Sequence, residues 1–214
     1  MTFSELKAAL VSWLNMDADS LPDAVCGQIV NMAIQEYSRK LDLRFNELTT
    51  IVMASAGVYY ADLPDSYSRP QTMYYIEVDG TVVYVDYITR EEYLIKYPNT
   101  VLTGAVKHYT VWNNQIMFGP TPQEDLMISF DIYEIVPDLV SPTATNGFTL
   151  HAWPLILMRS CCLASLFGVE DSRIPTWEAQ CVKLENQLVI EHARAKSVGR
   201  RPVSRDYGYT GKEA

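Results

Sequence analysis

The sequence offers few groups that could carry out chemistry. It contains three histidines, His108, His151 and His192, and none of them has the spacing of a metal site or a catalytic triad. His192 lies near the end of a predicted helix, where a polar edge position explains an imidazole without a catalytic role. The chain also lacks glycine-rich phosphate-binding sequences and the Gly-x-Ser-x-Gly motif of serine hydrolases.

Three groups of acids deserve the same test. The pairs Glu91-Glu92 and Glu124-Asp125 have the residue types of a glycosidase, although adjacent acids in turns and helix starts are commonly solvated surface. The segment Asp17-Ala-Asp19-Ser-Leu-Pro-Asp23 resembles the start of a calcium loop. However, Pro22 stands where that loop requires glycine, and Gln28 stands where it requires a bidentate glutamate. We therefore expect no catalytic residue, no metal and no cofactor.

The cysteines and the bulk composition point to a reduced, globular chain. No Cys-x-x-C spacing is present, so buried thiols are expected at Cys26, Cys161, Cys162 and Cys181. With 214 residues, 48% of them hydrophobic, the chain can bury one sizeable core or two small ones. No apolar run is long enough to span a membrane, and the start lacks a signal peptide. We expect a soluble protein made in the cytoplasm.

Amphipathic helices are predicted near both ends. The first has apolar residues at three- and four-residue steps from Phe3 to Leu14, and the second follows a capping-box pattern at Ser20-Leu-Pro-Asp23. After a loop at residues 141–147, a third apolar stripe runs from Trp153 to Phe167, and Gly168 is expected to end it. A fourth runs from Trp177 to Leu188.

Between Glu47 and Val136 the apolar period changes to two, which predicts β-strands. Asp79-Gly80 predicts a hairpin with a type I′ turn, because that turn needs positive φ angles. Asn113-Asn114 predicts a second hairpin for the same reason. A short capped helix is expected between the hairpins, from Thr89 to Lys96.

The predicted fold class is α+β, and the ends of the chain are expected to meet. The four helices can cover one another's apolar faces only as a helical bundle made from the N-terminal and C-terminal pairs. The antiparallel β-rich domain is then an insertion, and the bundle is followed by an extended C-terminal tail. The expected domains are residues 1–46 and 141–192 for the bundle, 47–140 for the β-rich insertion and 193–214 for the basic tail.

The charge of the tail differs in sign from that of the body. From Ala193 onward there are six Lys or Arg and two Asp or Glu, a net charge of +4, whereas the rest has 11 basic and 24 acidic residues, or −13. Such a split is typical of an interaction tail. A disordered, solvated end is the simpler alternative, but arginine and tyrosine are enriched at binding hot spots. The candidate binding residues are Arg200, Arg201, Arg205, Tyr207 and Tyr209.

Short motifs run through nearly the whole chain. They include YYADLP at residues 59–64, REEY at 90–93 before Tyr97-Pro98, and YTVWNNQIMFGPTP at 109–122, and they close with the helices that contain Trp153-Pro154 and Trp177. This pattern resembles the head-to-tail adaptor proteins of short-tailed (podovirus-type) and other tailed bacteriophages. These adaptors are also called head completion or connector proteins.

The resemblance implies a structural protein of the virion, made in the host cytoplasm and located at the head-tail junction. Such adaptors form a dodecameric ring that docks on the portal protein and connects it to the tail nozzle or tail tube. DNA passes through the lumen of the ring without specific binding. The tail would fold on the portal, where its arginines would pair with acids and its tyrosines would fill grooves. No enzyme activity and no membrane partner are implied.

The tyrosines leave one alternative open. Of the 14 tyrosines, six lie in or beside the predicted hairpins, where cross-strand packing explains them first: Tyr59, Tyr60, Tyr74, Tyr75, Tyr84 and Tyr87. A carbohydrate-binding face is the second explanation. The alternative function is therefore a carbohydrate-binding or tail-fibre-associated β-rich module.

Overall fold

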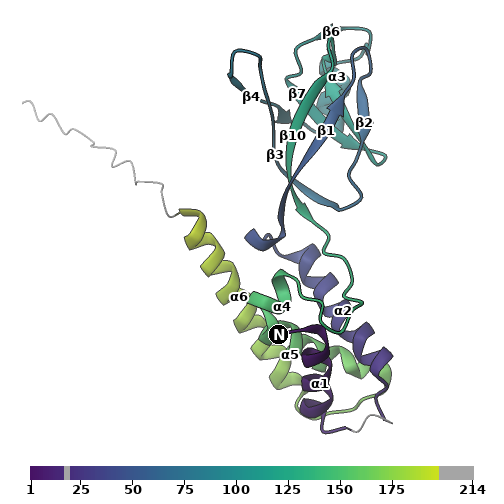
Figure 1. The fold of residues 1–214 in the computed structure, drawn as a ribbon, viewed down its shortest axis with the longest axis vertical. Coiled ribbons are helices and arrows are strands. Elements are labelled where there is room, and N and C mark those ends of the chain that lie inside the picture. The colour runs from purple at the N-terminus through teal and green to yellow at the C-terminus, as the bar shows by residue number, and fades with distance from the viewer. Residues whose placement is uncertain (17–19, 198–214) are drawn as a thin grey trace, which may run out of the picture.

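The structure, a computed structural model, describes residues 1–16 and 20–197 of the chain. The described part is elongated, with most helices at one end and the β-strands at the other (Figure 1). It contains the helices α1 (Phe3–Leu14), α2 (Asp23–Lys40), α3 (Arg90–Lys96), α4 (Gly147–His151), α5 (Trp153–Leu163) and α6 (Ile174–Ser197). Short 3-10 helices lie at Arg44–Asn46 and Ala164–Phe167.

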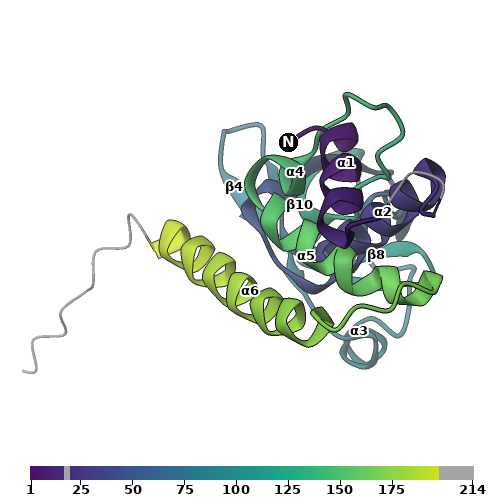
Figure 2. The same ribbon diagram turned by 90° about the horizontal axis from the view of Figure 1, so that it is seen from below.

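One hydrophobic cluster joins the helices from both ends of the chain. Leu6 of α1, Ile29 of α2 and Ile156 of α5 are completely buried in it, and Trp177 of α6 belongs to the same cluster. Helices α1 and α2 both contact α5, and α6 packs along α5 on the outside (Figure 2). Residues far apart in sequence therefore depend on one another for burial.

The two N-terminal helices begin differently. The Thr2 hydroxyl accepts a hydrogen bond from the Glu5 backbone N–H at 3.3 Å, and the Glu5 carboxylate accepts one from the Thr2 N–H at 2.8 Å. This capping box starts α1. The capping box predicted at Ser20–Asp23 is wrong, because Pro22 occupies the N-cap and cannot offer a side-chain acceptor. Asp23 instead forms an ion pair of 2.6 Å with Lys7.

The strands form two four-stranded sheets and one short pair. In sheet 1 the order is β1-β10-β3-β4, comprising Glu47–Ala54, Leu126–Glu134, Tyr67–Ile76 and Val82–Tyr84. In sheet 2 the order is β2-β8-β7-β5, comprising Tyr60–Asp62, Gln115–Gly119, His108–Trp112 and Asp86–Tyr87. The pair consists of β6 (Thr103–Gly104) and β9 (Thr121–Pro122).

The core of the β-rich part lies between the two sheets. Phe130 of sheet 1 and Phe118 of sheet 2 are completely buried there, and the rings of Tyr109 and Phe130 meet edge to face at 5.6 Å between centroids. Helix α3 covers the outer face of sheet 2, where the Tyr93 hydroxyl donates a 2.9 Å hydrogen bond to the Phe118 carbonyl. The outer face of sheet 1 has no such cover among the described residues.

The α+β class is confirmed, and most strand pairs are antiparallel. The exceptions are β5 with β7 and β6 with β9, which are parallel. The type I′ turn at Asn113-Asn114 is confirmed, because both residues have positive φ angles, 52° and 58°.

The turn type predicted at Asp79-Gly80 is wrong. Only Gly80 has a positive φ there, 87°, and its N–H bonds to the Glu77 carbonyl at 2.9 Å. The Asp79 carboxylate accepts the Thr81 N–H at 2.8 Å and so closes a three-residue loop rather than a two-residue one.

The C-terminal helices also depart from their predicted burial and length. Ile156, Leu157, Cys161 and Ala164 are buried as expected, whereas Trp153 and Phe167 of the same stripe are 38% and 40% exposed. The extra short helix α4 follows an Asn146 cap. Helix α6 continues to Ser197, so residues 193–197 are helical and do not begin an extended tail. Alanine, arginine and lysine have high helix propensity, which explains the extension.

The chain crosses between the two parts twice, and the second crossing is held by hydrogen bonds. The Asn31 side chain donates to the Leu139 carbonyl and accepts from the Leu139 N–H, both at 3.0 Å. The Gln35 amide donates to the Val136 carbonyl at 2.6 Å. Val136 and Leu139 are part of the helical cluster, so the segment after β10 returns to the helices at once.

Because Phe130 lies in the core between the two sheets, its truncation should strongly lower the stability of the protein. Phe130→Ala removes a completely buried ring that contacts both sheets, and we expect it to lower the free energy of unfolding by about 3–5 kcal/mol. Leu150→Ala, at a side chain that is 56% exposed, should change it by less than about 0.5 kcal/mol. Urea unfolding would measure both, and equal losses would contradict the assigned core.

Candidate functional site

The paired acids have structural roles. Glu92 forms a capping box with Thr89, in which the Glu92 carboxylate accepts the Thr89 N–H at 3.1 Å and the Thr89 hydroxyl accepts the Glu92 N–H at 3.3 Å. The Asp125 carboxylate accepts the Ala56 N–H at 2.8 Å. One acid of each pair is therefore used to hold backbone, as expected for acids at helix starts and turns.

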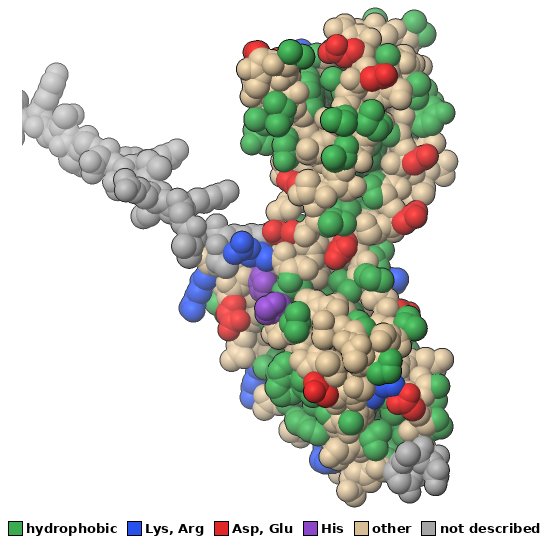
Figure 3. Space-filling view, in the orientation of Figure 1, with side chains coloured by type: hydrophobic (Ala, Val, Ile, Leu, Met, Phe, Trp, Pro, Cys, Tyr) green, Lys and Arg blue, Asp and Glu red, His purple; other side chains and the backbone are tan. Residues whose placement is uncertain are grey.

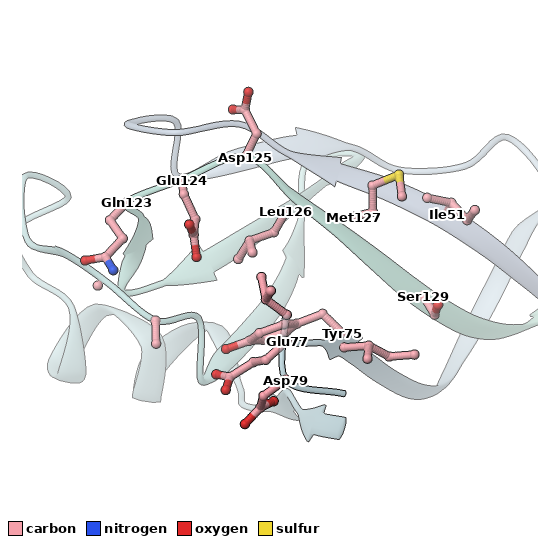
Figure 4. A pocket seen from close by; sticks show the side chains of 14 residues that line it. Ile51, Tyr75, Glu77, Asp79, Gln123, Glu124, Asp125, Leu126, Met127 and Ser129 are labelled. Atoms are coloured by element: carbon pink, nitrogen blue, oxygen red, sulfur yellow. The ribbon is translucent and has the colours of Figure 1, made fainter. Parts of the chain in front are cut away.

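A large hollow in the β-rich part is acidic. It has a volume of about 800 Å³ and is lined by Glu77, Asp79, Glu124 and Asp125, with no Lys or Arg among its lining residues. Figure 4 shows Glu77 and Asp79 on the hairpin between β3 and β4, and Glu124 and Asp125 where the chain enters β10. Burial, followed by the charges of Glu77 and Glu124, raises the pKa of Tyr75. The lining includes the Ser129 hydroxyl but no His, Lys or Cys that could activate it.

One histidine lies in the β-rich part, and the other two pack on one phenylalanine of the helical part. The Tyr97 hydroxyl lies 2.6 Å from Nδ1 of His108, on sheet 2 under α3. His151 stacks on Phe45 and His192 meets the same ring edge to face, with centroids 5.7 and 5.5 Å from it. His192 Nδ1 accepts the Arg44 backbone N–H at 3.1 Å. These contacts fit the polar edge role expected for His192 and bring no histidine to a paired nucleophile.

The tyrosines pack across strands and do not share one platform. Tyr74 and Tyr84 are register partners with ring centroids 6.1 Å apart, and Tyr75 is buried in the sandwich. The exposed rings are separated: Tyr84 lies on sheet 1, whereas Tyr60 and Tyr87 lie on the two opposite edge strands of sheet 2. The exposed rings lie on three separate strands, and Tyr84 stands beside its register partner Tyr74, so cross-strand packing explains this arrangement.

The cysteines and acids do not assemble a metal site among the described residues. Cys26, Cys161, Cys162 and Cys181 are buried and free, as predicted. Burial raises the pKa of the Cys161 thiol to about 12. No group of three or more His, Cys, Asp or Glu in residues 1–16 and 20–197 is placed to hold a metal ion. Asp17 and Asp19 of the calcium-like segment lie outside the described residues.

The comparison with protein families decides what kind of protein this is. The family model of the SU10 adaptor protein matches residues 1–202. The chain belongs to the SU10 adaptor protein family. The match covers both parts of the fold and confirms the resemblance to phage head-to-tail adaptors. A search of curated proteins gave no match.

Membership makes this adaptor a structural phage protein, from a family that is not one of enzymes. An adaptor acts by contact with other structural proteins of the phage, so its functional sites are surfaces. None of the helices in the described part of the chain has the length and apolar character that crossing a membrane requires.

The five predicted binding residues of the adaptor lie outside the described residues. They are Arg200, Arg201, Arg205, Tyr207 and Tyr209. The family match includes the first two and ends before the other three. The helix that leads toward them is well anchored, because Lys40 pairs with Glu185 of α6 at 2.7 Å and the Arg44 N–H bonds to His192. Helix α6 is therefore fixed to the helical part as far as His192.

Sequence reasoning missed two exposed apolar surfaces on the β-rich part. Ile51 and Met53 of β1 point to solvent while their neighbours Val52 and Ala54 are buried. The signal was present, because the run from Ile51 to Ala54 is apolar on both faces of the strand, which is unusual for a strand with a solvated face. On α3, Ile95 is likewise exposed, at 79%.

The environment of His108 predicts a pH effect on stability. Burial, followed by the charges of Lys96 and Lys107, lowers the pKa of His108 below its ordinary value of about 6.5. The unfolded chain then binds a proton near pH 6.5 that the folded chain takes up only at lower pH. The contribution of neutral His108 to the free energy of unfolding is fully present above about pH 6.5. It is lost as the pH falls through the pKa that His108 has in the folded chain.

His108→Gln removes this titration and keeps a polar partner for Tyr97. The free energy of unfolding of the wild type should fall more than that of the variant between about pH 7.5 and about pH 5. Urea unfolding at both pH values measures the difference. Parallel pH profiles for the two chains would contradict the assigned environment of His108.

Proposed function

We propose that this adaptor forms a dodecameric ring at the head-tail junction of a short-tailed phage. In this role it docks on the portal protein and connects it to the tail nozzle or tail tube around the DNA channel. The observation that carries the proposal is the family match over residues 1–202, which includes the helices and the β-rich part together. The adaptor is made in the host cytoplasm and becomes part of the virion.

The helices act as one bundle in this proposal, made from the N-terminal and the C-terminal pairs. The shared hydrophobic cluster supports this reading, since it contains residues from α1, α2, α5 and α6. The bundle carries the basic tail, and Arg200, Arg201, Arg205, Tyr207 and Tyr209 bind the portal. The sign change between tail and body supports this assignment, because charge-assisted pairs with acids need a cationic segment. Many tails acting together need little affinity each.

DNA passes the ring without specific binding. Residues 47–140 contain four Lys or Arg and 13 Asp or Glu, a net charge of −9, so the β-rich part repels phosphates. The exposed tyrosines of the described part lie on separate strands, which supports the adaptor role over a carbohydrate-binding or tail-fibre-associated module.

Loss of the tail should prevent docking. A chain that ends after Ser197 retains all the described elements. We expect its binding to purified portal rings of the same phage to be at least about tenfold weaker, because the arginine pairs and tyrosine contacts are gone. Co-sedimentation with the portal measures the bound fraction.

Charge variants test whether the arginines of the tail, and not merely its presence, are needed for portal binding. Replacing Arg200, Arg201 and Arg205 by Glu should reduce portal binding as strongly as the truncation does, whereas Lys212→Glu should have little effect. Undiminished binding of the truncated chain would leave the family assignment standing and remove the tail from portal docking. Failure of the full chain to bind the portal would remove the proposed function itself.

A further inference from the structure

The outer face of sheet 1 is an exposed apolar surface. Its side chains alternate with those of the sandwich core along all four strands, and the strand registers place them next to one another. The members of this sheet-1 face are the exposed Ile51, Met53, Ile76, Val82, Tyr84 and Met127, with the half-buried Tyr74 between them. Ile51, Ile76 and Met127 are 62–67% exposed, and contiguous exposed apolar surface of this kind is typical of an interaction site. Hydrophobic side chains are widespread over the β-rich part in Figure 3.

Strands β3 and β10 of sheet 1 separate beside this face. The ladder between β3 and β10 ends at the pair Tyr74 and Ser129, although both strands continue beyond it. Continuing the register would place Ile76 opposite Met127, and these residues instead line the two sides of the acidic hollow. Glu77 and Asp79 lie on the β3–β4 hairpin, on one side of this hollow, and no Lys or Arg lines it. The sheet-1 face therefore combines an apolar surface with an acidic edge.

The opposite side of the sandwich presents a second exposed surface, on α3 and sheet 2. Its apolar members are Leu94, Ile95 and Trp112, which are 51%, 79% and 54% exposed. The Arg90 guanidinium lies 5.6 Å from the Trp112 ring centroid, and Lys96 Nζ lies 3.4 Å from His108 Nε2. We call this surface, with Arg90 and Lys96, the α3 face.

The charges of the two faces are complementary. Residues 47–140 contain four Lys or Arg, and three of them, Arg90, Lys96 and Lys107, lie on or beside the α3 face. Glu91 and Glu92 share the first turn of α3 with Arg90, and Asp86 is the register partner of His108. The excess of positive charge is therefore confined to the C-terminal end of α3, where Lys96 and Lys107 both lie near His108. A surface with an acidic edge and a surface with a cationic edge attract each other when their apolar parts meet.

The two faces point in opposite directions, because they are the outer faces of the two layers of one sandwich. In Figure 2, α3 and β4 lie on opposite sides of the molecule. A contact between two unlike faces of the same chain is heterologous, and repeating it produces a ring if the rotation closes. From this geometry we infer that the sheet-1 face of one copy binds the α3 face of the next. The occupant of each face is thus a second copy of this chain.

This contact rests on the proposed ring and identifies the surfaces that build it. A contact of like faces would give closed pairs and could not continue around a ring. The acidic and cationic edges set the direction of assembly, since two sheet-1 faces would bring carboxylates together.

Two single variants test the contact. Met127→Glu places a charge in the sheet-1 face and leaves the α3 face intact, whereas Ile95→Glu does the reverse. Both side chains are largely exposed, so folding should be retained, which circular dichroism and thermal melting would verify. Leu166→Glu, at a side chain of the helical part that is 68% exposed, is the matched control. Ile51→Glu provides a second variant of the sheet-1 face.

Sedimentation velocity from micromolar concentration to the solubility limit gives the readout. The wild type and Leu166→Glu should self-associate, and each face variant alone should do so at least about tenfold more weakly. An equal mixture of Met127→Glu and Ile95→Glu should form dimers and nothing larger, because each chain retains one of the two matching faces. That rescue is specific to a head-to-tail contact.

Several results would overturn the inference. They are a wild type that remains a monomer throughout, face variants that associate like the wild type, or a mixture that shows no dimer. These outcomes differ from failure of the proposed function, which would appear as absence of binding to portal rings. An adaptor that loads on the portal while its face variants associate normally would keep the proposed function and lose only this contact.

Discussion

The apolar faces of the helices at the two ends of the chain can be buried only against one another. Helix α1 contacts α2 and α5, and α6 lies along α5, so no pair taken from one end of the sequence completes the core. This cluster can form only if the chain returns to the helices after the strands. The β-rich part therefore lies, in sequence, between two segments that pack against each other. The hydrogen bonds of Asn31 and Gln35 to the Leu139 and Val136 carbonyls fix the segment after β10 against α2.

The sequence predicted those features that depend on local pattern. Apolar periods located most helices and strands, and Asn113-Asn114 predicted its turn because positive φ angles at both positions suit asparagine. Predictions failed where a side chain or a proline did something other than what the local sequence pattern indicated. Asp79 bonds to the following backbone and lengthens its loop, and Pro22 replaces a side-chain cap. The exposure of Trp153 and Phe167 and the parallel pairing of β5 with β7 depend on tertiary packing, which a single period does not encode.

The chemistry of the surfaces was only partly readable. The motifs at residues 59–64 and 109–122 led to the adaptor family, which the family match confirms. The sequence did not reveal that the apolar run at Ile51–Ala54 supplies both a core and an exposed face, since that requires knowing which layer covers the strand. It also did not reveal that three of the four cations of residues 47–140 collect around one short helix.

The double crossing between the helical and the β-rich parts has a mechanical consequence. β1 and β10 are paired along their whole length from the junction outward, and both continue directly into segments packed on the helices. A paired ribbon resists bending and torsion far better than one flexible strand. We therefore expect a tilt of the sandwich to turn the helices with it. Such a connection would transmit a change in orientation, and not merely in separation, between the partners held at the two ends.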